Sequence, residues 1–171
     1  LTVMRPQSGL KTEEISTKGI DIILCMDTSG SMRAEDIKPN RVEGAKQTAI
    51  DFIKGRKNDR IGIVVFSAIS MMQCPLTLDY GAVIDFMKNV EIGMTQTDGT
   101  AIGNAISTCV NRLKDSNAKS KVVILLTDGR NNMGQIDPAT ASKLADTFDI
   151  KIYAIGVGAI GSAPYPVDDP I

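Results

Sequence analysis

The sequence predicts a doubly wound α/β fold, in which helices cover both faces of a mostly parallel sheet with one short antiparallel edge strand. Nearly continuous apolar segments, typical of strands buried on both faces, alternate along the chain with segments of helical periodicity. The composition, with 43% hydrophobic and 23% charged residues, is that of a globular protein. The length of 171 residues suits one domain with a substantial core.

Each element follows from a local pattern. Four apolar segments are predicted to form buried strands: residues 19–27, 60–67, 121–128 and 151–157. The segment 69–76 contains polar residues and Pro75, which favour a short edge strand. Four segments with apolar residues at helical spacing are predicted to form helices: residues 40–54, 78–90, 101–114 and 138–148. Asn40 is the expected N-cap of the first helix, and Pro138 suits the first turn of the last.

The predicted elements divide the chain into three parts. Residues 1–18 form a polar lead-in, residues 19–158 one domain, and residues 159–171 an irregular tail rich in proline. No stretch of about 18 apolar residues is present, so the sequence predicts no membrane-spanning helix. Because the chain begins with leucine and carries no signal-peptide pattern, we expect a soluble piece of a larger protein.

The composition excludes several classes of function. Histidine is absent, which removes Ser-His-Asp and Cys-His catalysis and the commonest zinc sites. The balance of 19 basic and 20 acidic residues, with no basic stripe, argues against binding to nucleic acid. Cys25, Cys74 and Cys109 lie far apart among apolar neighbours, so we expect buried free thiols.

Three polar segments follow or precede predicted elements at the carboxyl edge of the sheet. They are Asp27-Thr28-Ser29-Gly30-Ser31, Asp98-Gly99-Thr100-Ala101 and Thr127-Asp128-Gly129. Because parallel strands end at one edge, we expect these segments to meet there, where such folds bind ligands. Their hydroxyl and carboxylate oxygens suit Mg²⁺, Mn²⁺ or Ca²⁺ and disfavour softer metals.

This pattern resembles the von Willebrand factor type A family, whose metal-ion-dependent adhesion site has the motif DxSxS followed by a separate Thr and a separate Asp. The matching residues are Asp27, Ser29, Ser31, Thr100 and Asp128. The resemblance implies that the two serines and the threonine bind a divalent cation directly, Mg²⁺ or else Mn²⁺ or Ca²⁺. The two aspartates are expected to act through water, and an Asp or Glu of a protein partner would complete the coordination.

The chain is also similar to bacterial BatA-type, aerotolerance-associated members of this family. The similarity rests on four segments: 5–7, 36–41, 74–80 and 164–166. It implies a full-length protein anchored in the inner membrane with this domain on the periplasmic face, linked to stress and oxygen tolerance. Other type A proteins or a MoxR-type ATPase system are the partners it suggests. Family members usually continue past the strand at 151–157 with a helix, a strand and a final helix, so we expect these C-terminal elements to be truncated here.

Several alternatives stay open. Thr97 competes with Thr100 for the ligand position, and Asp27, Ser31 or Asp128 could simply stabilise turns. The domain could keep its fold and bind partners without metal. An Mg²⁺-dependent phosphoryl transfer through Asp27 is weakened because Ser29 stands where such enzymes carry a second acid. Neither a phosphate-binding GxxxxGK[ST] loop nor a Gly-x-Ser-x-Gly nucleophile elbow occurs.

Three methionines lie beside the predicted ligand segments: Met32, Met94 and Met133. Because methionine is flexible and polarizable, we interpret them as an apolar collar around the metal that contacts the flanks of the partner. The alternative is that they fill gaps in the core.

Overall fold

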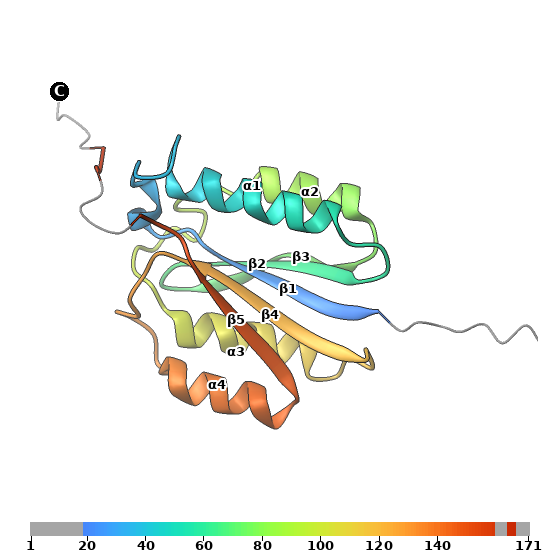
Figure 1. Cartoon of the computed structure of the whole chain (residues 1–171). Coiled ribbons are helices and arrows are strands. Elements are labelled where there is room, and N and C mark those ends of the chain that lie inside the picture. Colours follow the sequence, from blue (N-terminus) through green and yellow to red (C-terminus); the bar gives the residue numbers. More distant parts are fainter. Residues whose placement is uncertain (1–18, 160–163, 167–171) are drawn as a thin grey trace, which may run out of the picture.

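The computed structural model describes residues 19–159 and 164–166, in which one five-stranded sheet lies between two layers of helices (Figure 1). The strands are β1 (Ile20–Asp27), β2 (Arg60–Phe66), β3 (Ser70–Thr77), β4 (Ser120–Thr127) and β5 (Ile150–Gly156). Their order is β3-β2-β1-β4-β5, and β3 alone runs antiparallel to its neighbour, at the edge. The predicted fold class is therefore confirmed, although β3 is as long as β1 and not short.

The helices cover both faces of the sheet, as predicted. They are α1 (Arg41–Lys54), α2 (Tyr80–Lys88), α3 (Ile102–Leu113) and α4 (Pro138–Thr147), with a short 3-10 helix, η1 (Gly30–Arg33), after β1. Helices α1 and α2 lie on one side of the sheet, and α3 and α4 lie on the other (Figure 1). Asn40 caps α1 by accepting the amide hydrogen of Glu43 at 2.9 Å, which confirms the expected N-cap.

The core consists of two apolar clusters separated by the sheet. Alternate residues of β1 enter different clusters: Leu24 and Met26 pack toward α1 and α2, while Ile23 and Cys25 pack toward α3. This two-sided burial explains why β1 has a nearly continuous apolar sequence. All three cysteines are free and buried, as expected, and burial raises the pKa of the Cys25 thiol.

The segment 151–157 is not a buried strand, and this prediction was wrong. It forms β5 at the edge of the sheet, where Tyr153 is 55% and Ile155 41% exposed. Ile150 and Ile152 pack on the cluster beside α4, but the alternating side chains project to the opposite face. An apolar run indicates a strand but not its place in the sheet, because an edge strand with one packed face can have the same composition.

The strand order creates a switch point beside β1. The chain moves from β1 to β2 on one side and later returns to β4 on the other side, so the connections diverge at the carboxyl ends of β1 and β4. Asp27 closes β1 and Asp128 directly follows β4 at this edge. No helix of the described residues is long and apolar enough to span a bilayer.

Candidate metal centre

The loop after β1 presents its side chains through a small set of backbone contacts. The Asp27 carboxylate accepts the amide hydrogen of Ser29 at 2.9 Å, and the Ser29 and Ser31 hydroxyl oxygens lie 3.1 Å apart. The intervening Thr28 is turned away, because both its amide and its hydroxyl donate to the Phe66 carbonyl at the end of β2. Residues 27, 29 and 31 therefore face the same side of the loop, as their spacing predicts.

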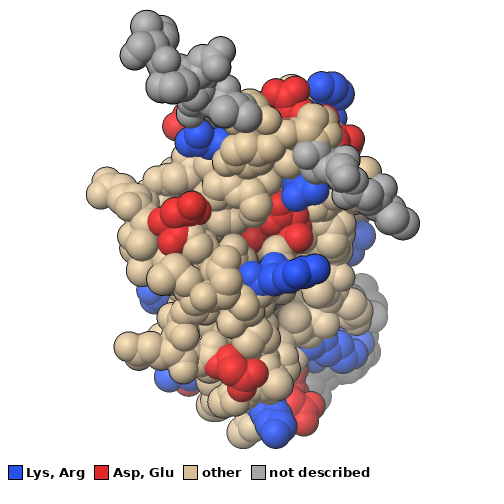
Figure 2. All heavy atoms as spheres, turned by 90° about the vertical axis from the view of Figure 1, so that its left-hand side faces the viewer, with Lys and Arg blue, Asp and Glu red and all other residues tan. Residues whose placement is uncertain are grey.

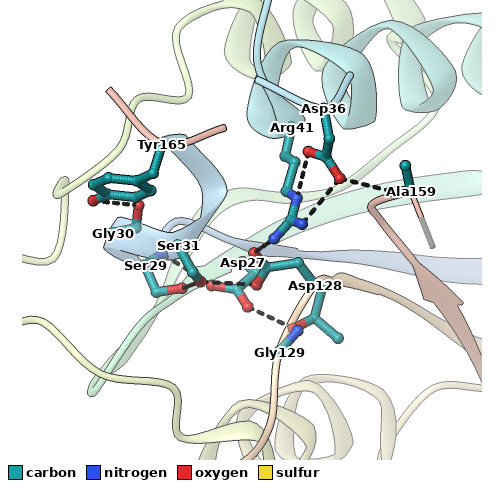
Figure 3. Close-up of polar contacts among 11 residues, drawn as sticks. Asp27, Ser29, Gly30, Ser31, Asp36, Arg41, Asp128, Gly129, Ala159 and Tyr165 are labelled. Atoms are coloured by element: carbon teal, nitrogen blue, oxygen red, sulfur yellow. Dashed lines mark hydrogen bonds and ion pairs between the residues drawn. The ribbon is translucent and has the colours of Figure 1, made fainter. Parts of the chain in front are cut away.

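Two hydrogen bonds join the carboxyl ends of β1 and β4 and the loops that follow them. The Ser31 hydroxyl donates to Asp128 Oδ1 at 2.8 Å (Figure 3). The Thr127 hydroxyl donates to Asp27 Oδ2 at 2.5 Å. The two bonds join residues 97 and 100 positions apart in the chain. The parallel pairing of β1 with β4 makes this possible, because it brings their carboxyl ends side by side.

Thr100 comes from the segment before α3 and lies against the same two loops. A Cβ atom placed on Gly129 would be 3.2 Å from Thr100 Cγ2 and 3.5 Å from Asp27 Oδ2, so a side chain at 129 would crowd both. The backbone of Thr100 is held by Asn132, whose side-chain oxygen accepts its amide hydrogen at 2.8 Å. Thr97, the competing residue, is exposed. The structure thus brings all five predicted ligand residues to one edge of the sheet.

The carboxylates at this edge differ in their surroundings. Asp27 has no solvent exposure, and burial raises its pKa, although hydrogen bonds from Thr127 and Ser29 oppose that shift. Asp98 instead accepts amide hydrogens from Gly30 at 3.1 Å and Gly99 at 2.9 Å, and these bonds lower its pKa. Asp98 therefore links the loop after β1 to the loop that carries Thr100, a role that its sequence position did not reveal.

Arg41, at the start of α1, was also missed as a residue of this site. Its Nη1 atom lies 2.5 Å from Asp128 Oδ2, and its Nε and Nη2 atoms donate to the Asp36 carboxylate at 2.8 and 2.9 Å. Asp36 also accepts the amide hydrogen of Ala159 at 2.6 Å, and these bonds lower its pKa to about 2. The segment 36–41 is one of the four segments that resemble the aerotolerance-associated group, but nothing in its spacing connects it to Asp128.

The methionines do not form a continuous collar. Met32 is completely buried in the cluster beneath α1, so for this residue the core-filling alternative applies and a partner contact does not. The turn of η1 directs its side chain inward, which the sequence could not indicate. Met94 is half-buried and packs on the same cluster, whereas Met133 is 47% exposed and lies against Gly99.

The donor set fits a hard divalent cation that uses hydroxyl ligands. Among the described residues, no three acidic or cysteine side chains gather as a metal-binding group. The oxygens that do converge are hydroxyls and two carboxylates, already within hydrogen-bond distance of one another, which is the ligand chemistry of Mg²⁺, Mn²⁺ or Ca²⁺. Figure 2 faces this edge and shows acidic side chains among mostly uncharged surface, with basic side chains beside them.

Comparison with known proteins identifies the family of this domain. The family model for the von Willebrand factor type A domain matches residues 22–131, from β1 to the loop after β4. The chain belongs to this family. The matched region includes all three loops of the candidate metal centre. Domains of this family commonly mediate protein interactions and often bind a metal.

Two solved structures share the fold closely. An aerotolerance-related membrane protein from Bacteroides fragilis, carrying multiple mutations to serine, is 30% identical with a TM-score of 0.81, over 89% of this chain and 74% of that one. The conserved hypothetical protein BatB from Bacteroides thetaiotaomicron is 32% identical with a TM-score of 0.82, over 89% and 73% of the two chains. The aerotolerance-associated subgroup expected from the sequence is therefore represented among its structural neighbours.

Two further relatives differ more in length. An uncharacterized protein of Borreliella burgdorferi is 34% identical over 145 residues, which span 82% of this chain but 41% of that protein. The present chain thus covers less than half of this curated relative. Proximal thread matrix protein 1 from the mussel byssus, solved with zinc in its MIDAS motif, is 27% identical with a TM-score of 0.71, over 84% and 37% of the two chains.

Proposed function

We propose that this domain binds a protein partner through a divalent cation, Mg²⁺ or alternatively Mn²⁺ or Ca²⁺, held at the carboxyl edge of the sheet. Ser29, Ser31 and Thr100 would ligate the cation directly, and Asp27 and Asp128 would act largely through water. The observation that supports this most is the chain of contacts from Ser29 through Ser31 to Asp128, three oxygen-bearing side chains from two strand ends. The zinc-occupied motif of the mussel protein supports metal binding in the family.

The side chains at this edge would fix the position of a bound cation and offset only part of its charge. The Ser29 and Ser31 hydroxyls are neutral ligands, and Asp27 is held in place by Thr127 and by the amide of Ser29. A divalent cation bound there would supply positive charge that these ligands leave partly uncompensated, and hence an attractive position for a carboxylate of the partner. An Asp or Glu side chain is therefore the partner group that the site would select.

Phosphoryl transfer through Asp27 is the less favoured function. Asp27 is completely buried, and both its carboxylate oxygens accept hydrogen bonds from Ser29 and Thr127. A nucleophilic carboxylate needs an oxygen within reach of the phosphorus atom and an acid to protonate the leaving group. Residue 29, two positions on, is a serine that cannot serve as that acid.

The relatives extend the proposal to the cellular setting. A neighbour described as an aerotolerance-related membrane protein supports anchoring of the full-length protein in the inner membrane. We place the domain on the periplasmic face, with another type A protein or a MoxR-type ATPase system as the candidate partner. Both the position and the partners rest on the resemblance to the aerotolerance-associated group.

Metal titration by calorimetry tests the central claim. Wild-type protein should bind one Mg²⁺ or Mn²⁺ ion. Ser29→Ala removes a proposed direct ligand and should weaken binding at least as much as the loss of an outer-shell partner does, which is about 10–100-fold. Ser142→Ala is a matched control on the surface of α4 and should bind like wild type. Absence of binding to the wild-type protein would refute metal dependence.

Partner capture tests the second half of the proposal. Immobilised domain, exposed to detergent-solubilised membranes, should retain partner proteins in Mg²⁺ and release them in EDTA. Asp27→Ala should retain none, because the variant loses a charge that supports the cation. If neither EDTA nor Asp27→Ala reduces the amount of partner captured, the result would favour a type A domain that binds its partner without metal.

A further inference from the structure

We propose that Arg41 is a built-in cation that competes with the divalent metal for Asp128, and that Asp36 moderates this competition. The inference rests on the proposed metal site and assigns its affinity control to two residues outside the adhesion motif. Arg41 is a positioning residue in this scheme, because it contacts Asp128 and would not itself bind the metal.

The contacts of Asp128 engage both of its carboxylate oxygens. Its Oδ1 atom accepts the Ser31 hydroxyl at 2.8 Å, and its Oδ2 atom lies 2.5 Å from Arg41 Nη1 (Figure 3). The Asp128 side chain is 2% exposed and that of Arg41 is 15% exposed. A charge-assisted bond in such a shielded position is stronger than one on the surface, because little water competes for either partner.

The guanidinium is fixed from its other side as well. Asp36 binds it through Nε and Nη2, and this pairing raises the pKa of Arg41, with Asp128 contributing further. A Cβ atom on Gly158 would lie 3.2 Å from three atoms of the guanidinium, and the φ of +147° at this position favours glycine, so the absence of a side chain eases the close approach of the backbone. Arg41 is thus enclosed by two carboxylates and the chain that leaves β5.

This arrangement determines how much of the charge on Asp128 remains for a metal. Arg41 occupies one oxygen of Asp128 and offsets its charge, which keeps the carboxylate an outer, water-linked group. Asp36 in turn offsets Arg41, so the positive potential at the site is smaller than that of an unpaired arginine. Together, these charges would leave the positive charge of a bound cation only partly compensated, so that it attracts a carboxylate of the partner.

Two substitutions with opposite expected signs provide the test. Arg41→Gln removes the competing cation, so the affinity for Mn²⁺ measured by calorimetry should rise about tenfold over wild type. Asp36→Asn leaves Arg41 uncompensated beside Asp128, so Mn²⁺ affinity should fall by a comparable factor. Arg41→Lys keeps the positive charge and should show no rise, and melting in EDTA should show that each variant is folded.

The outcomes separate this inference from the proposed function. Tighter Mn²⁺ binding by Arg41→Gln together with weaker binding by Asp36→Asn supports the competition, since structural damage alone would weaken both. Binding by Arg41→Gln but not by wild type supports the competition and contradicts a wild-type metal site. Unchanged or weaker binding by Arg41→Gln, with a wild type that binds, overturns the inference alone. Absence of binding in every variant overturns both.

Discussion

At the candidate metal centre, single side chains depend on hydrogen-bond partners, some of which come from a distant strand. The buried carboxylate of Asp27 is stabilised by the Thr127 hydroxyl and the Ser29 amide, because a charged group without such donors would be too costly in the core. Met32 and Met133 occupy similar places in the sequence, beside the candidate ligand loops, but Met32 is buried in the core and Met133 is exposed. The local sequence does not indicate this difference in burial.

At the residue scale, we predict unequal effects for two methionine substitutions. Met32→Ala should lower the free energy of unfolding by about 2–5 kcal/mol, because it opens a cavity in the cluster beneath α1. Met133→Ala, at a position 47% exposed, should change it by less than about 0.5 kcal/mol. Urea unfolding followed by circular dichroism measures both, and similar losses in the two variants would contradict the burial seen here.

The elements around the site stabilise one another's ends. Helix α3 begins without a side-chain cap of its own, and the Asn131 side chain from the loop after β4 accepts the Ile102 amide hydrogen at 2.8 Å. The Asn104 side chain of α3 accepts the amide hydrogen of Ile136 at 3.1 Å. The loop that carries Asp128 is therefore anchored to the helix that follows Thr100, and this contact connects two of the candidate ligand segments.

At the element scale, Gly103→Ala should disturb this anchor. A Cβ atom at residue 103 would overlap the Ile136 carbonyl, so the gain in helix propensity is outweighed and stability should fall by about 1–3 kcal/mol. Gly55→Ala is the control: at the end of α1, with φ of −80°, its new Cβ would meet no atom closer than 3.5 Å. Thermal melting should show little change or a small gain for the control, and equal losses would refute the explanation.

The whole molecule is organised by a sheet that belongs to both cores. Val83 lies in the cluster beneath α1 and α2, and Val110 lies in the cluster beneath α3 and α4, yet β1 contributes residues to each. If the helices on either side lose their packing, one face of the shared strands is exposed to water. The two clusters should therefore unfold together.

At the scale of the molecule, we predict one cooperative transition for wild type, Val83→Ala and Val110→Ala. Each substitution truncates a fully buried side chain and should cost about 2 kcal/mol. Both should move the urea midpoint and leave the slope unchanged, because the surface exposed on unfolding stays the same. A second transition in either variant would show that the layers unfold separately.

Much of the fold can be predicted from local sequence patterns, and particular elements show where such predictions fail. The predicted strand at 60–67 and the observed β2 (Arg60–Phe66) agree because β-branched and aromatic side chains pack well on the pleated surface of a sheet. The predicted helix at 78–90 is shorter in the structure, since Asp79 caps it and the exposed Leu78 lies outside. For β5 the pattern predicted a strand correctly and its burial wrongly.

By itself, the amino-acid order determined the α/β alternation and indicated three candidate ligand segments, because hydrophobic period and loop composition are properties of neighbouring residues. Tertiary structure decided what requires distant residues to meet: the exposure of β5, the burial of Met32, and the Arg41–Asp36 pair beside Asp128. The physical reason is that burial and charge pairing depend on which elements pack together in space. Nothing within the segment 36–41 indicates that its arginine reaches a residue 87 positions away.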